Sequence, residues 1–218
     1  MKNTIGNVLM SFAILGWIKA EIVFPEDGVT LNYTHIMFRW TQDPDCNLYN
    51  LVAINSSNDT TMDIHTGRTM YIDQTNFNWG QGYVAMLTPI YENESSAQTI
   101  DTISFNIGPA YTFADLNIEI INAEDIQDGL ALFSQVSPNF RMVAIDKLGN
   151  QVWNSEFAYI NHWNEHGQLF GMKDGRGVEV NFYDDILWMT PSGTEIDAHE
   201  IKQIPNGNYM GITTEYQL

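Results

Sequence analysis

The chain has 218 residues, of which 44% are apolar and 12% aromatic, a composition that excludes an intrinsically disordered protein. Its formal net charge is −18 with only 9 Lys and Arg, so nucleic acid is not expected as a partner, because phosphate binding needs clustered positive side chains. A soluble acidic surface is the simplest interpretation; calcium binding is the alternative, although the sequence has no Asp-x-Asp-x-Asp-Gly loop. The single cysteine, Cys46, can form no disulfide within the chain, and its neighbours supply no positive field for a catalytic thiol.

The first twenty residues have the pattern of a secretory signal peptide. Lys2 gives a positive start, residues 8–18 form an apolar run, and Ala20 offers a small residue at a cleavage site. The run is too short to span a bilayer of roughly 30 Å. We therefore expect residues 1–20 to be removed and the mature protein to be periplasmic or extracellular, without a membrane contact. A buried N-terminal helix and an uncleaved anchor are the alternatives.

Short strands separated by turn signals predict a β-sandwich over residues 21–108. Every second residue is apolar along three segments: Ile36, Phe38 and Trp40; Tyr49, Leu51 and Ala53; and Tyr83, Ala85 and Leu87. This alternation is typical of strands buried on one face, so we expect Trp40 in the core. Pro89 is expected to end the third segment, and residues 102–107 to form a last strand. His35 and His65 are expected as strand or surface residues.

A new segment begins at Gly108 and Pro109. Residues 111–128 are expected to form a linker, and its apolar stretch, residues 116–121, is expected to pair with the edge of a sheet.

The second half contains an internal repeat. The segment from Val143 to Trp153 returns 35 residues later as Val178 to Trp188. Turn residues stay in register, at Gly149-Asn150 and Asp184-Asp185, and a second pair of turns at His166-Gly167 and Asn206-Gly207 interleaves with them. Each unit predicts a strand, a tight turn and a strand ending in a Trp that packs between neighbouring sheets. Units of 35 to 40 residues are typical of β-propeller blades; an ordinary β-meander is the alternative.

The sequence therefore predicts an all-β protein with three parts. Residues 1–20 are the signal peptide, 21–108 the sandwich, and 109–218 the start of an incomplete propeller with about two blade units. Propellers typically need four to eight blades, so we expect further blades after Leu218. A ring assembled from several copies of the chain, a homo-oligomer, is the alternative.

Two parts of the sequence resemble known families. Residues 21–108 resemble a fibronectin type III domain, in Trp40 late in the second strand and in the segment from Gly82 to Pro89. Residues 108–218 resemble the arylsulfotransferase family, in which a histidine followed by an acidic residue or a second histidine precedes a Leu-Pro-Asn-Gly-Asn stretch. Here the matching segments are residues 195–200, Glu-Ile-Asp-Ala-His-Glu, and 204–208, Ile-Pro-Asn-Gly-Asn.

The arylsulfotransferase resemblance implies transfer of a sulfuryl group from an aryl sulfate donor to a phenolic acceptor. The family uses a transiently sulfurylated histidine in the propeller funnel and no separate cofactor or metal. Only His199 carries over by motif, with an expected catalytic role in binding sulfate oxygens or assisting proton transfer. Glu200 is not expected to orient it, because adjacent residues of a strand face opposite sides. The covalent histidine has no counterpart in the 218 residues, so whether this chain is an enzyme stays open.

Other interpretations remain. His162 and His166 have a His-x-x-x-His spacing, but a zinc pair would need a helix and a third ligand, and their neighbours favour a loop. A non-enzymatic exported adhesion or binding protein, with a sandwich and propeller repeats, is the alternative function. A quinone-dependent dehydrogenase, whose blades also carry Gly-x-x-x-Trp turns, is a third.

Overall fold

The computed structural model describes residues 19–92, 101–112, 119, 122–135, 141–197 and 199–213. These residues form an all-β protein of seventeen strands in five sheets, with one 3-10 turn, η1 (Ala123–Asp125). Within those ranges there is no α-helix and no closed barrel or propeller. No helix in this part of the chain is long and apolar enough to cross a membrane. The predicted signal peptide lies outside the described residues, except for Lys19 and Ala20.

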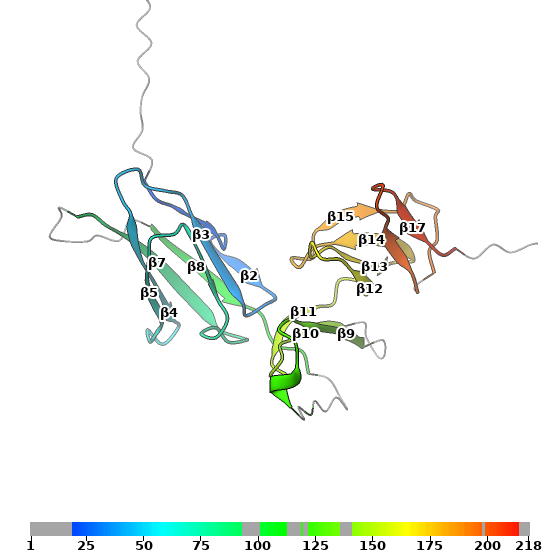
Figure 1. Ribbon diagram of the computed structural model, residues 1–218, viewed down its shortest axis with the longest axis horizontal. Helices are drawn as coiled ribbons and strands as arrows, with labels where there is room; N and C mark the ends of the chain where they lie inside the picture. The colour runs from blue at the N-terminus through cyan, green and yellow to red at the C-terminus, as the bar shows by residue number, and fades with distance from the viewer. Residues whose placement is uncertain are drawn as a thin grey trace, which may run out of the picture.

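Residues 19–92 and 101–108, here called the two-sheet unit, form two sheets that pack face to face (Figure 1). The first has the order β1 (Ile22–Phe24), β3 (Ile36–Trp40) and β6 (Met70–Asp73). The second has the order β2 (Val29–Leu31), β8 (Asp101–Ile107), β7 (Gly82–Ile90), β4 (Leu48–Asn55) and β5 (Thr60–Thr66). Neighbouring strands are antiparallel, except for the parallel pair β2 and β8.

The core of the two-sheet unit confirms the predicted alternation. Ile36, Phe38 and Trp40 are at most 2% exposed. The rings of Phe38 and Trp40 bridge the two sheets. Phe38 lies edge-on to Phe105 with ring centroids 5.9 Å apart, and Trp40 lies edge-on to Tyr49 with ring centroids 5.6 Å apart. Because such aromatic pairs add to the gain from burial, they fix how one sheet sits on the other.

The prediction that Pro89 ends its strand is wrong. β7 continues to Ile90, and Pro89 pairs with Tyr49 of β4. On the other side of β7, pairing with β8 reaches only to Leu87, opposite Asp101. Proline lacks a backbone N–H, and no described residue of β8 lies opposite Pro89 to need that donor.

The linker is described only in part. Tyr111 and Thr112 lie outside any strand, and η1 provides the next regular structure. Of the apolar stretch 116–121, only the exposed Glu119 lies within the described residues, so its pairing with a sheet edge stays a prediction.

Three antiparallel sheets form the second half (Figure 1). One contains β9 (Ala131–Gln135), β10 (Arg141–Ile145) and β11 (Gln151–Ser155). The next contains β12 (Tyr159–Trp163), β13 (Leu169–Lys173), β14 (Arg176–Val180) and β15 (Ile186–Met189). The last contains β16 (Ile201–Gln203) and β17 (Tyr209–Gly211). Consecutive strands pair within each sheet, as in a meander.

The predicted hairpin turn between β10 and β11 is confirmed, and its geometry explains the residue types. The Asp146 carboxylate accepts hydrogen bonds from the N–H groups of Leu148 (2.9 Å) and Asn150 (2.8 Å). Gly149, the fourth residue of the turn, has a positive φ of 81° and donates its N–H to the Asp146 carbonyl at 3.0 Å. This is a type I turn followed by a left-handed residue, a common way to close a hairpin.

The same turn recurs between β14 and β15, where the sequence repeat predicts it. The Asn181 side chain accepts from the N–H groups of Tyr183 (2.9 Å) and Asp185 (3.0 Å), and Asp184 has a φ of 65°. The backbone pattern is also found at residues 55–59, 164–168 and 204–208. The repeat is therefore a structural one, built on a shared five-residue turn.

The three sheets of the second half follow one another face to face. Trp153 in the middle of β11 is 2% exposed, packs edge-on against Phe182, and donates its indole N–H to the Phe182 carbonyl at 2.8 Å. On the opposite face of the four-stranded sheet, Trp188 stacks on Tyr209 of β17 with ring centroids 3.6 Å apart. This confirms that the repeated Trp residues pack between neighbouring sheets.

A segment of the two-sheet unit completes the first of these sheets. Tyr33 forms an antiparallel bridge with Trp153 of β11. The Thr34 N–H donates to the Val152 carbonyl at 2.9 Å, and the Asn154 N–H donates to the Asn32 carbonyl at 3.0 Å. The two halves of the chain are therefore joined by backbone pairing as well as by the linker.

Candidate functional site

The loop that carries His199, residues 195–200, connects β15 to β16; Ala198 is outside the described residues. Hydrogen bonds fix its backbone on both sides. The Ile196 N–H donates to the Gly175 carbonyl at 3.1 Å, and the Asp197 N–H donates to the Ile212 carbonyl at 2.8 Å. The Ile212 N–H returns a bond to the Glu200 carbonyl at 3.3 Å. The sequence therefore places the histidine on a braced turn that leads directly into β16.

The His199 side chain is 84% exposed and is held by a carboxylate that the sequence analysis missed. The His199 N–H donates to Oδ1 of Asp197 at 2.9 Å, and the ring Nδ1 contacts the same oxygen. These bonds lower the pKa of Asp197, with the ring contact as the larger cause. Glu200 instead pairs with Lys202 at 2.5 Å and does not hold His199, as expected, although both residues precede β16 and strand alternation is not the reason. An Asp side chain often accepts the backbone N–H of the residue two positions later, in an Asx turn. The Asp-Ala-His order of residues 197–199 could therefore have identified Asp197.

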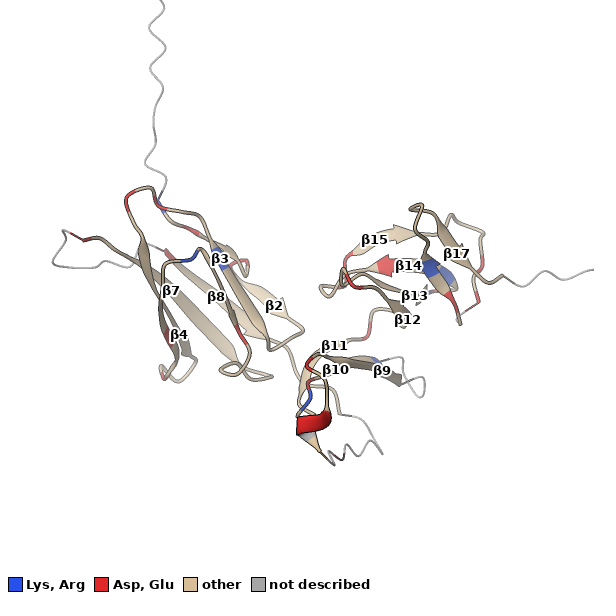
Figure 2. Cartoon of the chain, in the orientation of Figure 1, with Lys and Arg blue, Asp and Glu red and all other residues tan. Residues whose placement is uncertain are grey.

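The positive side chains of the second half are all engaged elsewhere. Arg141 pairs with Glu156, Lys147 with Asp128 and Lys202 with Glu200, while Lys173 and Arg176 donate to the carbonyls of Phe157 and Thr190. Figure 2 shows acidic positions spread over both halves of the chain, with few basic ones between them. A sulfate held at His199 would therefore depend on the imidazole itself, or on groups outside the described residues, for positive charge.

The other two histidines of the second half lie in different settings. His162 lies in β12 and not in a loop, so that part of the prediction is wrong; its ring lies 5.8 Å from that of Phe170 across the strand pair. His166 lies in the turn 164–168, where its N–H donates to the Asn164 side chain at 3.0 Å. Pairing with Phe170 of β13 places His162 in a strand, although its neighbours in the sequence favour a loop. Within the described ranges, no group of three His, Cys, Asp or Glu side chains could hold a metal ion.

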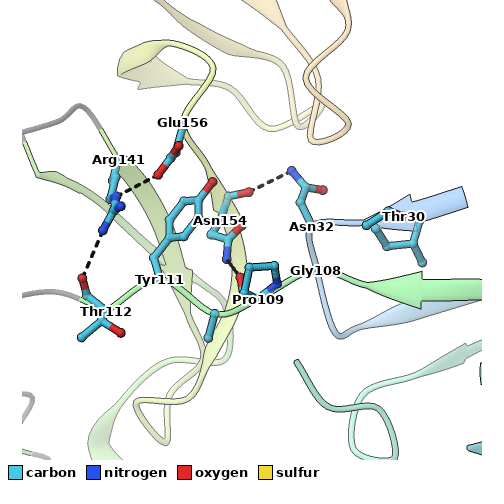
Figure 3. Close-up of a pocket in the computed structure, with 11 residues that line it drawn as sticks. Thr30, Asn32, Gly108, Pro109, Tyr111, Thr112, Arg141, Asn154 and Glu156 are labelled. Carbon is cyan, nitrogen blue, oxygen red and sulfur yellow. Dashed lines mark hydrogen bonds and ion pairs between the residues drawn. The ribbon is translucent and has the colours of Figure 1, made fainter. Parts of the chain in front are cut away.

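An open pocket of about 590 Å³ lies where the two-sheet unit meets the second half (Figure 3). Its most polar wall is Arg141, whose guanidinium pairs with Glu156 at 2.8 Å and donates to the Thr112 carbonyl at 3.3 Å. The guanidinium also lies over the Tyr111 ring, 5.1 Å from its centroid. Burial, and then the nearby Glu156 carboxylate, raise the pKa of Tyr111 to about 12.

The opposite wall of this pocket is tied to the linker by amide side chains. Asn154 donates to the Pro109 carbonyl at 3.0 Å, and Asn32 donates to the Asn154 carbonyl at 2.8 Å, as Figure 3 shows. With Arg141 already satisfied, the arrangement clamps the linker against β11. It offers little chemistry to a ligand.

A buried carboxylate lies between the second and third sheets of this half. Glu179 is 3% exposed and accepts hydrogen bonds from the Gln168 amide and the Tyr209 hydroxyl. Burial first, and then the Glu179 carboxylate, raise the pKa of Tyr209 to about 12. Buried polar groups need hydrogen-bond partners, so these three residues hold β17 against the four-stranded sheet.

No protein-family model matches this chain, and no curated protein matches it. The fold and the site therefore define only a broad class, an all-β protein whose packed antiparallel sheets present an exposed histidine held by an aspartate.

Proposed function

We propose that this chain is the N-terminal part of an exported arylsulfotransferase, in which His199 acts on the sulfuryl group or on the phenolic acceptor. The observation that carries the proposal is the position of His199. It stands on a braced turn at the entry to β16, directly before the hairpin that closes with Pro205-Asn206-Gly207-Asn208. This is the motif through which the chain resembles the family.

The arrangement of the second half supports the propeller part of this proposal. A four-stranded antiparallel meander is the usual form of a blade. Here one such sheet lies between a three-stranded and a two-stranded one, and β10–β11 and β14–β15 share the same turn. In this interpretation β12 and β16 are the inner strands of successive blades, so His199 faces the funnel.

The two-sheet unit supports the fibronectin-type-III-like part. Its sheets have the strand division three plus five, and Trp40 is the last residue of β3, the third strand and not the second as expected. The Asn78 N–H donates to the Tyr83 hydroxyl at 2.9 Å, at the corner where β6 leads into β7. A Tyr bonded back across this corner is a recurring feature of immunoglobulin-like sandwiches.

The test is sulfuryl transfer from 4-nitrophenyl sulfate to phenol by the full-length gene product. We expect His199→Asn to lower kcat by about 10²- to 10³-fold, the usual cost of losing one group that stabilises developing charge. His166→Asn, in the exposed turn 164–168, is the matched control and should change kcat little. Circular dichroism and the melting temperature check the fold. Near wild-type turnover by a folded His199→Asn protein would contradict the catalytic role.

A non-enzymatic exported binding protein is the second candidate. The observation that favours it is the charge around His199: the carboxylates Asp197 and Glu200 are close in the chain, and the basic side chains of this half are engaged. An anionic substrate gains little in such a field. Absence of turnover by the wild-type protein with several aryl sulfates would support this candidate.

A further inference from the structure

We propose that Asp197 is a positioning residue, which holds His199 with its proton on Nδ1 and so leaves Nε2 free to accept a proton from a phenolic hydroxyl. The inference rests on the proposed function for the substrate, but the contact between the two side chains is independent of it.

The protonation of the ring follows from the chemistry of the two partners. The pKa of Asp197 lies below its usual value, so the carboxylate is ionised near neutral pH and can only accept hydrogen bonds. The ring nitrogen that contacts it, Nδ1, must then carry a proton. In a neutral imidazole the other nitrogen, Nε2, is left as the acceptor.

The orientation of the ring is set by a fixed backbone. One oxygen of Asp197 receives both the backbone N–H of His199 and its ring Nδ1, so the carboxylate controls the main chain and the side chain together. The Asp197 N–H is itself bonded to the Ile212 carbonyl at 2.8 Å. An exposed histidine without these bonds would sample several rotamers, whereas here Nε2 is directed away from the carboxylate.

The chemical consequence is a base directed at solvent or substrate. As a phenol attacks the sulfuryl sulfur, its O–H bond breaks and the proton forms an N–H bond at Nε2 of His199. The phenol oxygen forms the new S–O bond while the S–N bond of a sulfurylated histidine, which lies outside these 218 residues, breaks and leaves its electron pair on that nitrogen. The resulting His199 imidazolium keeps its bond to Asp197, whose charge balances it, and later releases the proton to water. Proton transfer of this kind typically contributes about 10²- to 10⁴-fold to a rate.

The first arm of the test measures the ring directly. In the ¹⁵N-labelled chain, the nitrogen shifts of His199 distinguish the Nδ1–H from the Nε2–H form, with His199→Asn identifying the signals. We expect the wild type to be mainly Nδ1–H at neutral pH. Asp197→Ala should return the ring to the Nε2–H form that free histidine prefers, while Asp197→Asn, which keeps an acceptor oxygen, should retain part of the Nδ1–H form. Glu200→Ala, which removes the other nearby carboxylate, is the matched control and should change nothing.

The second arm measures turnover of the full-length gene product with 4-nitrophenyl sulfate and phenol. Asp197→Ala should lower kcat on the order of tenfold to a hundredfold with little change in KM, and Glu200→Ala should leave kcat unchanged. An unchanged tautomer in Asp197→Ala, or a changed tautomer with unchanged kcat, would overturn the inference. A wild type with the Nδ1–H form but no turnover would instead overturn the proposed function and the base role, and would leave the positioning contact standing.

Discussion

The two halves of this chain build their cores in different ways. The two-sheet unit has long strands, with eight residues in β4 and nine in β7, and its two sheets enclose an aromatic core that includes Phe38 and Phe105. The second half has strands of at most five residues, and each of its sheets covers the next. Trp153, for example, is buried by the turn of the following sheet, through Phe182.

This difference predicts a difference in autonomy. A unit that encloses its own core can fold alone, whereas a stack of short sheets obtains its stability from each neighbouring interface. The two-sheet unit gives the stack one such interface, through the pairing of residues 32–34 with β11.

The largest expected effect comes from separating the halves. Residues 21–108 expressed alone should melt in one cooperative transition, because their core is enclosed between their own sheets. Residues 109–218 alone should aggregate or melt without cooperativity, because β11 loses its pairing with residues 32–34 and its edge is exposed. Thermal melts followed by circular dichroism measure both. A sharp thermal transition of monomeric 109–218 would show that the second half also folds alone, and would contradict the expected difference between the halves.

Replacement of Trp40 by Ala should cost the whole chain about 3 to 5 kcal/mol of unfolding free energy, as is typical for a buried Trp. Trp40 is 2% exposed, whereas Trp163 in β12 is 48% exposed. Trp163→Ala is therefore the matched control and should cost about 0.5 kcal/mol or less. Urea melts give both values. Equal losses of unfolding free energy in Trp40→Ala and Trp163→Ala would contradict the expected effect of burial.

A smaller effect is expected at the junction itself. Asn32→Ala removes the hydrogen bond to the Asn154 carbonyl at 2.8 Å and should destabilise the chain by about 0.5 to 1.5 kcal/mol. The neighbouring Thr30 has an exposed side chain, so Thr30→Ala should change little. The same Asn32→Ala change within residues 21–108 alone should have almost no effect, because its partner is then missing. A loss of equal size in that fragment would place the effect outside the junction.

The smallest effect concerns alkaline pH. The pKa of Tyr209 is raised from 10.0 to about 12 in the folded protein, so the unfolded chain loses this proton first as the pH rises. The stability that the protonated hydroxyl contributes is fully present below pH 10 and is lost between about pH 10 and 12. Urea midpoints across that range should fall less steeply in Tyr209→Phe than in the wild type. Ultraviolet titration should show one fewer phenol ionising late, with the pKa of Tyr111 still raised to about 12, and an unchanged slope of the urea midpoints in the variant would contradict the assignment.

Local features of this fold could be predicted from the sequence, because they depend on neighbouring residues. Alternation identified the buried face of β3, and the Gly149 and Asp184 positions identified hairpin turns, since each supplies the positive φ that the fourth turn residue needs. Trp153 and Trp188 were correctly expected between sheets, although neither ends its strand, since β11 continues to Ser155 and β15 to Met189.

Features that join distant segments could not be predicted in this way. The pairing of Tyr33 with Trp153 links residues 120 positions apart, and nothing in either local pattern favours it over another partner. Pro89 was misjudged because the end of the pairing with β8 is a property of the sheet and not of the strand. Asp197 lies within the candidate motif, but its contact with His199 depends on how the turn bends.

The short pairing of residues 32–34 with β11 also bears on self-association. A strand with unpaired N–H and C=O groups on one side is a template for a second chain, and this segment occupies part of that side on β11. If the segment leaves β11 in one molecule, the equivalent segment of another can take its place, which exchanges the two-sheet units between two chains. A high protein concentration would then favour swapped dimers, in which every bond of the junction is kept but each crosses from one molecule to the other.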